Sequence, residues 1–581
     1  MTVNEKITAL RAHMVAQQIA AIVIPSGDAH LSEYVCDHFR LRAYLSGFTG
    51  SAGTLVVGLE WAGLWTDGRY HTQAAAQLEG TPITLYPAGK AGVETLYQVL
   101  EAKVTAGQTI AVDGTTISKA QGDLLKDSAK KIGGKLRLDW ACPASLWPDR
   151  PALPQGLVHP IDNAGQSAKE KLAQLWCDEK TYLITALDDI AWVLNLRGQD
   201  LAHTPVFLSY LWVAPKGATL FIQTGKLTPQ AQGHLAELAV TVAPYEAVEG
   251  HCASHQGSKV VVDPNQINAR LYQLLGHNVE EGTHGIGARK AIKTPSELEH
   301  LRNAHKKDAV AMVTFLHYLE ENVGKIPLTE VTAGAIVDQL RSEQEGYLSP
   351  SFTTICGYNA NGAIIHYEAK ATTCATLEPH GLLLVDSGGQ YTDGTTDITR
   401  TIPLGEMSDA MRRDYTLVLK GHLALANAVF PEGTTGAALD VLARTPLWAE
   451  GLDYLHGTGH GVGYRLSVHE GPQSIGYQRK DGPALEVGMV TSNEPGYYLP
   501  QSHGIRLENL MVCQKADHAG FLQFEPLTLV PFDKRAIDWS LMTEVECEWL
   551  NDYHNLVFRE IAPLLSKELE QWLQKVTSLD I

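Results

Sequence analysis

The sequence lacks the features that mark membrane and exported proteins. No stretch reaches the ~18 consecutive apolar residues that would span a bilayer. Residues 1–27 carry Glu5, Lys6 and Arg11 before a short apolar run, and they show neither the basic start nor the cleavage site of a signal peptide. We therefore expect a cytoplasmic protein that does not bind membranes.

The sequence also contains fewer basic than acidic residues. The 46 lysine and arginine residues face 65 aspartate and glutamate residues, so the formal net charge is -19. This excess of negative charge repels the phosphates that supply most nucleic-acid affinity. The composition therefore argues against a nucleic-acid partner.

Cysteine is present but shows no disulfide or metal-binding pattern. The eight cysteines are scattered along the chain, with no close pair of the CxxC kind. This spacing is typical neither of a disulfide scaffold nor of a thiolate metal site. Any metal site is therefore expected to use other ligands.

What the chain does have is the composition of a folded protein with several domains. It holds 581 residues, 44% hydrophobic and 19% charged, and because domains usually hold ~100 to 200 residues we expect three. Buried-strand runs at Ile22–Ile24 and Gly53–Val57 alternate with a helical pattern at 93–103. A later segment repeats this alternation, with a helix near 168–176 and a strand at 218–222. The pattern predicts an α/β (α+β) fold whose two N-terminal segments are structural relatives.

Two local signals predict the domain limits. Five prolines between residues 142 and 160 remove backbone donors and predict a linker. The run Thr294-Pro295-Ser296-Glu297 has the N-cap, the first-turn proline and the capping-box acid of a helix start. We therefore expect domains at 1–150, 151–293 and 294–581, the last opening on a long amphipathic helix.

Two aspartates follow a buried strand in the third expected domain. The apolar run 382–385 leads into Asp386, a glycine-rich bend follows, and a second strand starts just after Asp397. The bend could bring the two carboxylates close together. Aspartates at such positions are more often turn or capping residues than ligands, so the pair alone does not identify a site.

Further candidate ligands follow along the chain. The segment 456–463 places His456 and His460 four residues apart, but its four glycines are incompatible with a stable helix and predict a loop. Such a loop can present a histidine to a metal ion. Glu494 and Glu508 flank a turn between two strand-like runs. Each acid, taken alone, is better explained as a structural residue, and His460 is equally well explained either way.

The order of these residues resembles a known metal-site signature. Asp, Asp, His, Glu and Glu stand here in surroundings similar to those of the metallopeptidases with the pita-bread fold. The segments DSGGQYTDGTTDITRT, HGTGHGVGYRLSVHEGP, NEPGYY and GIRLENL look most like those of aminopeptidase P of the long, three-domain cytosolic type. The resemblance extends over 47–53, 65–70, 190–198 and 549–554 and so covers nearly the whole chain.

The resemblance implies two creatinase-like N-terminal domains and a C-terminal pita-bread catalytic domain that binds two divalent metal ions. Asp386 would bind one ion, Asp397 and Glu508 would bridge both, and His460 and Glu494 would complete the second. Carboxylates with one imidazole suit hard to borderline ions, so Mn²⁺ is expected, with Zn²⁺ or Co²⁺ as alternatives. A hydroxide shared by the two ions would be the nucleophile.

The resemblance also implies roles for residues around the ligands. Glu494 would carry a proton from the attacking water to the leaving proline nitrogen. His366 and His469 match substrate-binding histidines, which would orient the proline side and stabilise the developing oxyanion. His456 and Arg506 match positions next to the ligands, where Arg506 would orient a carboxylate.

The implied function is that of an Xaa-Pro aminopeptidase, which acts on peptides with proline at the second position. Prolidase shares the fold and the metal set but cleaves Xaa-Pro dipeptides, and the long chain with its 549–554 segment favours the aminopeptidase. Creatinase shares the fold without the metal ligands, and a pita-bread protein that only binds partners would have broken ligand positions, whereas all five are filled here. The resemblance further implies a homodimer formed through the C-terminal domain.

Overall fold

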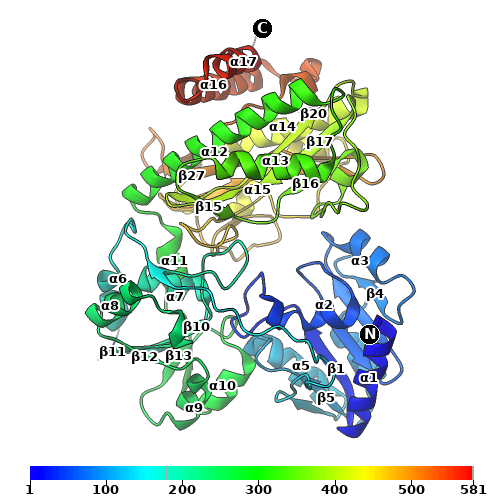
Figure 1. The fold of residues 1–581 in the computed structure, drawn as a ribbon, viewed down its shortest axis with the longest axis vertical. Helices are drawn as coiled ribbons and strands as arrows, with labels where there is room; N and C mark the ends of the chain where they lie inside the picture. Colours follow the sequence, from blue (N-terminus) through cyan, green and yellow to red (C-terminus); the bar gives the residue numbers. More distant parts are fainter. Residues whose placement is uncertain (178, 216, 579–581) are drawn as a thin grey trace. The chain divides into compact units, whose positions relative to one another are not determined.

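The chain is organised into two compact units. The structure, a computed structural model, describes residues 1–177, 179–215 and 217–578. Unit 1 is Met1–Ile286 and unit 2 is Gly287–Ile581, shown in blue to green and in green to red in Figure 1. Residues 579–581, at the end of the expected third domain, lie outside the described residues. Among the helices that are described, none combines the length and apolarity needed to cross a membrane.

Unit 1 contains two six-stranded sheets with the same plan. In each, the first strand along the chain pairs antiparallel with the second and parallel with the fifth. The spatial orders, β4-β3-β2-β1-β5-β6 and β12-β11-β10-β8-β13-β14, match strand for strand. This confirms that the two N-terminal segments are structural relatives. The strands are β1 (Ile19–Pro25), β2 (Thr54–Gly58), β3 (Ala62–Thr66), β4 (Thr84–Pro87), β5 (Thr109–Val112), β6 (Lys135–Arg137), β8 (Thr181–Ile184), β10 (Ser209–Ala214), β11 (Gly217–Ile222), β12 (Val240–Ala243), β13 (Val260–Val262) and β14 (Val279–Glu281).

Helices accompany both sheets of unit 1, and several begin at capping boxes. The hydroxyls of Thr2 and Ser167 each accept a hydrogen bond from a backbone N–H three residues on, at Glu5 and Glu170. Residues 140–157, where prolines predict a linker, contain neither helix nor strand. The domain limit at residue 150 stays a prediction. The helices are α1 (Val3–Ala16), α2 (Leu41–Ser46), α3 (His71–Gln77), α4 (Leu96–Lys103), α5 (Lys119–Lys131), α6 (Ala168–Trp176), α7 (Leu187–Leu194), α8 (Pro229–Glu237), α9 (Ala247–Ser254) and α10 (Ala269–Leu275).

The segment that follows unit 1 belongs with unit 2. Helix α11 (Ile286–Ala291) carries Lys290, and Lys293 follows it. Their amino groups lie 3.5 and 2.9 Å from the buried carboxylate of Glu470. These ion pairs join residues 287–293 to unit 2, which starts at Gly287. The domain limit at residue 294 stays a prediction.

Two antiparallel sheets form the centre of unit 2, with strand orders β16-β17-β20 and β21-β28-β27-β24. A small sheet, β15-β18-β19, and the hairpins β22–β23 and β25–β26 adjoin them. The strands are β15 (Tyr347–Pro350), β16 (Ile355–Tyr358), β17 (Leu382–Ser387), β18 (Gly389–Tyr391), β19 (Gly394–Thr395), β20 (Ile398–Pro403), β21 (Val429–Pro431), β22 (Gly459–His460), β23 (Ser474–Ile475), β24 (Val490–Asn493), β25 (Gly496–Leu499), β26 (His503–Arg506), β27 (Asn509–Lys515) and β28 (Phe521–Pro526).

Long helices cover these sheets (Figure 1). Helix α12 begins as predicted, since Thr294 caps it, Pro295 is its first residue and Glu297 closes the capping box. Met312 and Phe315 of α12 share a buried core with Val337 of α13 and with apolar residues of β17. The helices are α12 (Pro295–Asn322), α13 (Glu330–Ser342), α14 (Asp409–Ala426), α15 (Gly436–Ala449), α16 (Glu544–Ile561) and α17 (Lys567–Thr577).

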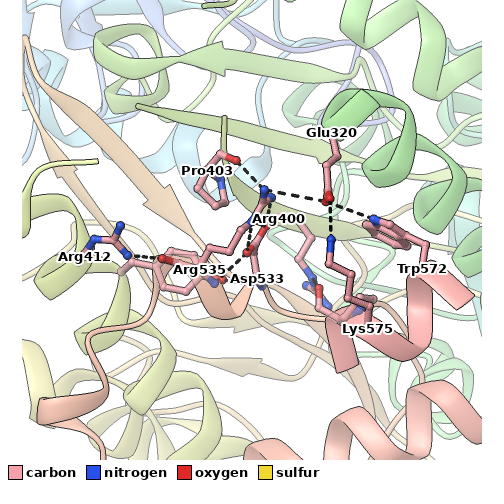
Figure 2. Close-up of polar contacts among 10 residues, drawn as sticks. Glu320, Arg400, Pro403, Arg412, Asp533, Arg535, Trp572 and Lys575 are labelled. Atoms are coloured by element: carbon pink, nitrogen blue, oxygen red, sulfur yellow. Dashed lines mark hydrogen bonds and ion pairs between the residues drawn. The ribbon is translucent and has the colours of Figure 1, made fainter. Parts of the chain in front are cut away.

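The two C-terminal helices are part of unit 2 and not a loose tail. Glu320 of α12 accepts hydrogen bonds from Trp572 (3.1 Å) and Lys575 (3.4 Å) of α17. Arg535 lies 3.9 Å from the same carboxylate and pairs with Asp533, as Figure 2 shows. These contacts join α17, near the C-terminal end of unit 2, to α12, near its N-terminal end.

Candidate metal centre

The first sheet of unit 2 positions two of the predicted ligands. In the β17–β20 pair, Asp386 lies opposite Thr399, so Asp397 stands at the start of β20 close to the end of β17. The bend between them is tight. A Cβ atom at Gly388 would lie 2.1 Å from the carbonyl oxygen of Thr396, so only glycine fits there. This close approach brings the two aspartates together.

The second sheet positions the two glutamates in the same way. Asn493 of β24 pairs with Asn509 of β27. Glu494 directly follows the first of these residues and Glu508 directly precedes the second, so both lie at one end of the strand pair. The backbone N–H of Glu508 donates to the carbonyl of Thr399 (3.1 Å) and thereby joins this end to the first sheet.

The histidine loop adds the fifth predicted ligand. The backbone N–H of His460 donates to the Ser492 hydroxyl (2.9 Å), and its Nδ1 lies 2.9 Å from the carbonyl of Gly461. Because a carbonyl only accepts hydrogen bonds, Nδ1 carries a proton, which leaves Nε2 as the nitrogen that can bind a metal ion once it has lost its own proton. Nε2 lies 3.5 Å from oxygens of both Asp397 and Glu494.

These side chains form overlapping groups of ligand atoms. In each of three sets, one nitrogen or oxygen per residue lies within 4.8 Å of the others. Asp397, Glu508 and His460 each belong to two sets, and Asp397 and Glu508 are the two that link the set containing Asp386 to the sets containing His460. The sets are Asp386, Asp397 and Glu508; His460, Glu494 and Glu508; and Asp397, His460 and His469.

One arginine and one threonine hold the carboxylates in place. The Arg506 guanidinium donates to Asp386 (2.5 Å), to the Thr399 hydroxyl (3.2 Å) and to the Tyr498 hydroxyl (2.8 Å). The Thr399 hydroxyl in turn donates to Glu508 (2.7 Å). Ligands from the two sheets are thus fixed by a single connected set of hydrogen bonds, and the structure places Arg506 where the sequence predicts it.

His456 reaches this set of hydrogen bonds through Tyr498. Its Nδ1 lies 2.8 Å from the carbonyl of Gly457, and its Nε2 lies 2.8 Å from the Tyr498 hydroxyl. The tyrosine therefore accepts from Arg506 and donates to His456. Sequence reasoning missed Tyr498, although it lies in the NEPGYY segment. The signal was the hairpin itself, since Gly496 pairs with Arg506 and alternate residues share a face.

Burial makes the carboxylates costly to ionise. It raises the pKa of Glu508 well above its ordinary value, and the neighbouring carboxylates, Asp397 first, raise it further. Burial also raises the pKa values of Asp386 and Glu494. His460 behaves differently, because burial opposes its charge but the carboxylates beside it raise its pKa to about 9. The protein alone therefore holds more negative charge here than it compensates.

Comparisons with known proteins identify the family. The model described as metallopeptidase family M24 matches residues 299–515, and that of the C-terminal region of this peptidase matches residues 520–579. Aminopeptidase P2 of Arabidopsis thaliana is 39% identical over 99% of this chain and 88% of its own length. The chain belongs to metallopeptidase family M24.

The rest of this M24 chain has relatives too. Models of the creatinase/prolidase N-terminal domain match residues 6–135 and 149–297. A probable Xaa-Pro aminopeptidase P of Fusarium vanettenii is 42% identical over 95% of this chain and 94% of its own. The crystal structure of X-prolyl aminopeptidase from Caenorhabditis elegans, described as a cytosolic enzyme with a di-nuclear active site, has a TM-score of 0.95 and 34% identity, covering 100% of both chains. The expected creatinase-like domains and pita-bread domain are confirmed.

The donor set of the M24 chain fits two divalent ions. Four carboxylates and one imidazole converge, and Oδ1 of Asp386 is buried without a hydrogen-bond partner. A buried, unpaired carboxylate oxygen and raised carboxyl pKa values are what a cation would relieve. Oxygen ligands with one nitrogen and no sulfur suit hard to borderline metals.

The two remaining predicted residues of the M24 site differ in how they are placed. The ring of His469 lies edge-on to that of His460, with centroids 4.3 Å apart, so the structure brings it to the ligands. His366 is half-buried in a loop that follows the short helix η3 (Asn359–Ala363). That helix packs against β26, the strand that ends at Arg506.

Proposed function

We propose that this M24 peptidase is an Xaa-Pro aminopeptidase, which removes the N-terminal residue from peptides with proline second. The observation that carries the proposal is the convergence of Asp386, Asp397, His460, Glu494 and Glu508 in one cluster. The relatives named Xaa-Pro aminopeptidase P, aligned over nearly the whole chain, support it.

Two divalent ions held by these five residues, proposed as Mn²⁺ with Zn²⁺ or Co²⁺ as alternatives, would lower the pKa of a shared water to give the hydroxide nucleophile and would polarise the scissile carbonyl. Asp386 would hold one ion, His460 and Glu494 the other, and Asp397 and Glu508 both. This division follows the overlapping sets, in which only those last two residues connect the aspartate side to the histidine side.

Glu494 is suited to move a proton. Its carboxyl accepts a hydrogen bond from the Ser492 hydroxyl (3.3 Å), and a carboxylate at this position can accept a proton and release it again. We propose that it takes a proton from the attacking water and delivers it to the leaving proline nitrogen. The side chain retains 18% of its exposure, which leaves it within reach of a substrate.

The histidines and the arginine would orient the substrate and the metal ligands. His469, beside His460, and His366 would bind the proline side of the substrate and stabilise the oxyanion. Arg506 would hold Asp386 in its binding geometry, and His456 would fix Arg506 through Tyr498.

Metal-dependent cleavage at proline is the direct test. Metal-stripped protein with added Mn²⁺ should release the first residue from an Xaa-Pro-Xaa tripeptide, because the buried carboxylates cannot supply a nucleophile without a cation. An Xaa-Ala-Xaa tripeptide and an Xaa-Pro dipeptide are the controls, with products identified by mass spectrometry. Cleavage of the dipeptide alone would indicate prolidase, and no cleavage with any divalent metal would favour a protein that only binds partners.

We also propose a homodimer, formed through the C-terminal unit, in the cytoplasm. The support is similarity: the Caenorhabditis elegans relative is described as cytosolic, and the 549–554 segment resembles that of the same family. Light scattering should give twice the chain mass. A monomeric mass at micromolar concentration would refute the homodimer, without affecting the proposed reaction.

A further inference from the structure

The loop that carries His366 has little regular structure of its own. After η3, residues 364–381 form no helix or strand before β17 begins. Local turns, such as that from Ile364 to Tyr367 (3.0 Å), supply part of its hydrogen bonding. A loop of this kind stays in one conformation only if other parts of the protein hold it.

A single buried carboxylate holds both this loop and the segment that leads into it. Glu330, fully buried, accepts from the backbone N–H groups of Tyr358 (2.7 Å) and Ala375 (2.8 Å). It also accepts from the Asn361 amide (2.9 Å) and from the Tyr367 hydroxyl (2.7 Å). Tyr367 and Ala375 lie in the loop itself, whereas Tyr358 and Asn361 precede it, in β16 and η3.

The location of Glu330 favours its charge. It is the first residue of α13, where the backbone N–H groups of the helix start stabilise an anion. Its backbone N–H donates to the carbonyl of Ala375 (3.1 Å), so main chain and side chain both hold the far end of the loop. Hydrogen bonds that a carboxylate accepts from N–H and O–H groups are charge-assisted, and they are stronger than bonds between neutral groups.

Tyr367 is the part of this arrangement closest to the substrate site. It directly follows His366, and its hydroxyl both donates to Glu330 and accepts from the Asn361 amide (3.0 Å). Asn361 belongs to η3, which packs against the Arg506 strand. The backbone on both sides of His366 is therefore fixed by contacts that end on one carboxylate.

We infer that Glu330 is a positioning residue, which acts through Tyr367 to hold His366 where the substrate binds. This inference rests on the proposed function, because it assigns His366 a role in substrate binding. Glu330 itself touches neither ligand residues nor substrate. The loop is thus preorganised from a helix that carries none of the predicted site residues.

A double-mutant cycle tests this inference. Glu330→Gln would place a donor amide among buried donors and endanger the fold, so Tyr367→Phe, which removes only a hydroxyl, is the better probe. We expect kcat/KM on an Xaa-Pro-Xaa tripeptide to fall roughly tenfold or more in Tyr367→Phe, with metal content unchanged. In a His366→Ala background the same change should have no further effect, because the loop then has no histidine to position.

Tyr272→Phe is the matched control. It removes a Tyr–Glu hydrogen bond of the same kind, from Tyr272 to Glu281 (2.8 Å) in unit 1, and should leave kcat/KM unchanged. Wild-type activity in Tyr367→Phe, or an equal loss in the presence and absence of His366, would overturn the inference.

Hydrogen exchange separates this inference from the proposed function. Amides of residues 364–376 should exchange faster in Tyr367→Phe than in the wild type, and equal exchange would contradict the role of Glu330. If the wild-type protein cleaved no Xaa-Pro substrate with any divalent metal, the proposed function would fail, while the exchange experiment would still decide whether Glu330 orders the loop.

Discussion

Asp397→Ala protein should lose more than about a hundredfold of the wild-type turnover on an Xaa-Pro tripeptide. Even residues that only support metal ligands typically change activity by about 10- to 100-fold. Asp397 belongs to two of the three ligand groups, so its loss affects both proposed ions. Steady-state kinetics, with bound metal measured per chain, checks the effect.

Asp393→Ala provides the control for that experiment. Asp393 lies in the same bend, but its carboxylate pairs with Lys307 (2.5 Å). The control variant should keep wild-type turnover and metal content. Wild-type turnover in Asp397→Ala would mean that the wrong acids have been assigned.

The metal-free form of Asp397→Ala should also keep its fold. The pKa values of Asp386 and Glu508 are raised by burial and then by neighbouring charge, to which Asp397 contributes. A carboxyl whose pKa is higher in the folded than in the unfolded protein destabilises the fold as the pH rises. The free energy of unfolding falls from the unfolded-state pKa, about 4, up to the folded-state pKa. Removing Asp397 reduces this loss, and Glu494 remains beside the imidazole of His460 to stabilise its charge. In chelator at neutral pH the variant should therefore unfold at no lower temperature than the metal-free wild type, which thermal melts across pH will show.

Arg506→Lys should lower kcat/KM by about 10- to 100-fold, the range seen for residues that support metal ligands. A lysine keeps the charge but lacks the planar fork that contacts Asp386, Thr399 and Tyr498 at once. Asp386 would then lose its fixed orientation. Tripeptide kinetics and metal titration of the variant measure the two consequences.

Arg302→Lys is the matched control. Arg302 makes a two-pronged contact with Glu525 (2.7 and 2.8 Å) at a half-exposed site outside the ligand cluster. Such exposed pairs contribute little, at most about 1 kcal/mol, so kcat/KM should stay at the wild-type value. Equal effects in the two variants would show that Arg506 has no special relation to the metal centre.

The residues of the candidate centre could be found in the sequence because each candidate ligand lies in a short, recognisable segment. Asp386 lies near the end of a run of apolar residues, so sequence alone indicated a strand end there. The glycines around His460 correctly excluded a helix, but the loop predicted there contains the two-residue strand β22. The start of α12 was equally predictable, since its capping box is local. Such features depend on residues within a few positions of each other.

Tyr498 and Glu330 could not be predicted, for a different reason. The contact of Tyr498 with Arg506 depends on the register of a hairpin, and a shift by one residue would turn the tyrosine away. Glu330 looks like any acid in the first turn of a helix. Its partners lie 28 to 45 residues further on, and only the folded chain brings them to it.

The candidate metal centre consists of two halves, the aspartate pair and the glutamate pair, and each half can form earlier in folding than the complete centre. Asp386 and Asp397 are joined by the short hairpin β18–β19, and Glu494 and Glu508 by the hairpin β25–β26, so each half is local in sequence. The bond from Thr399 to Glu508 spans 109 residues, and contacts of such separation form late because a long loop must close first. Each half can therefore arise early, but a site for two ions exists only when the sheets have met. Metal should consequently bind after folding, and because it binds only the folded state it should stabilise the protein against unfolding.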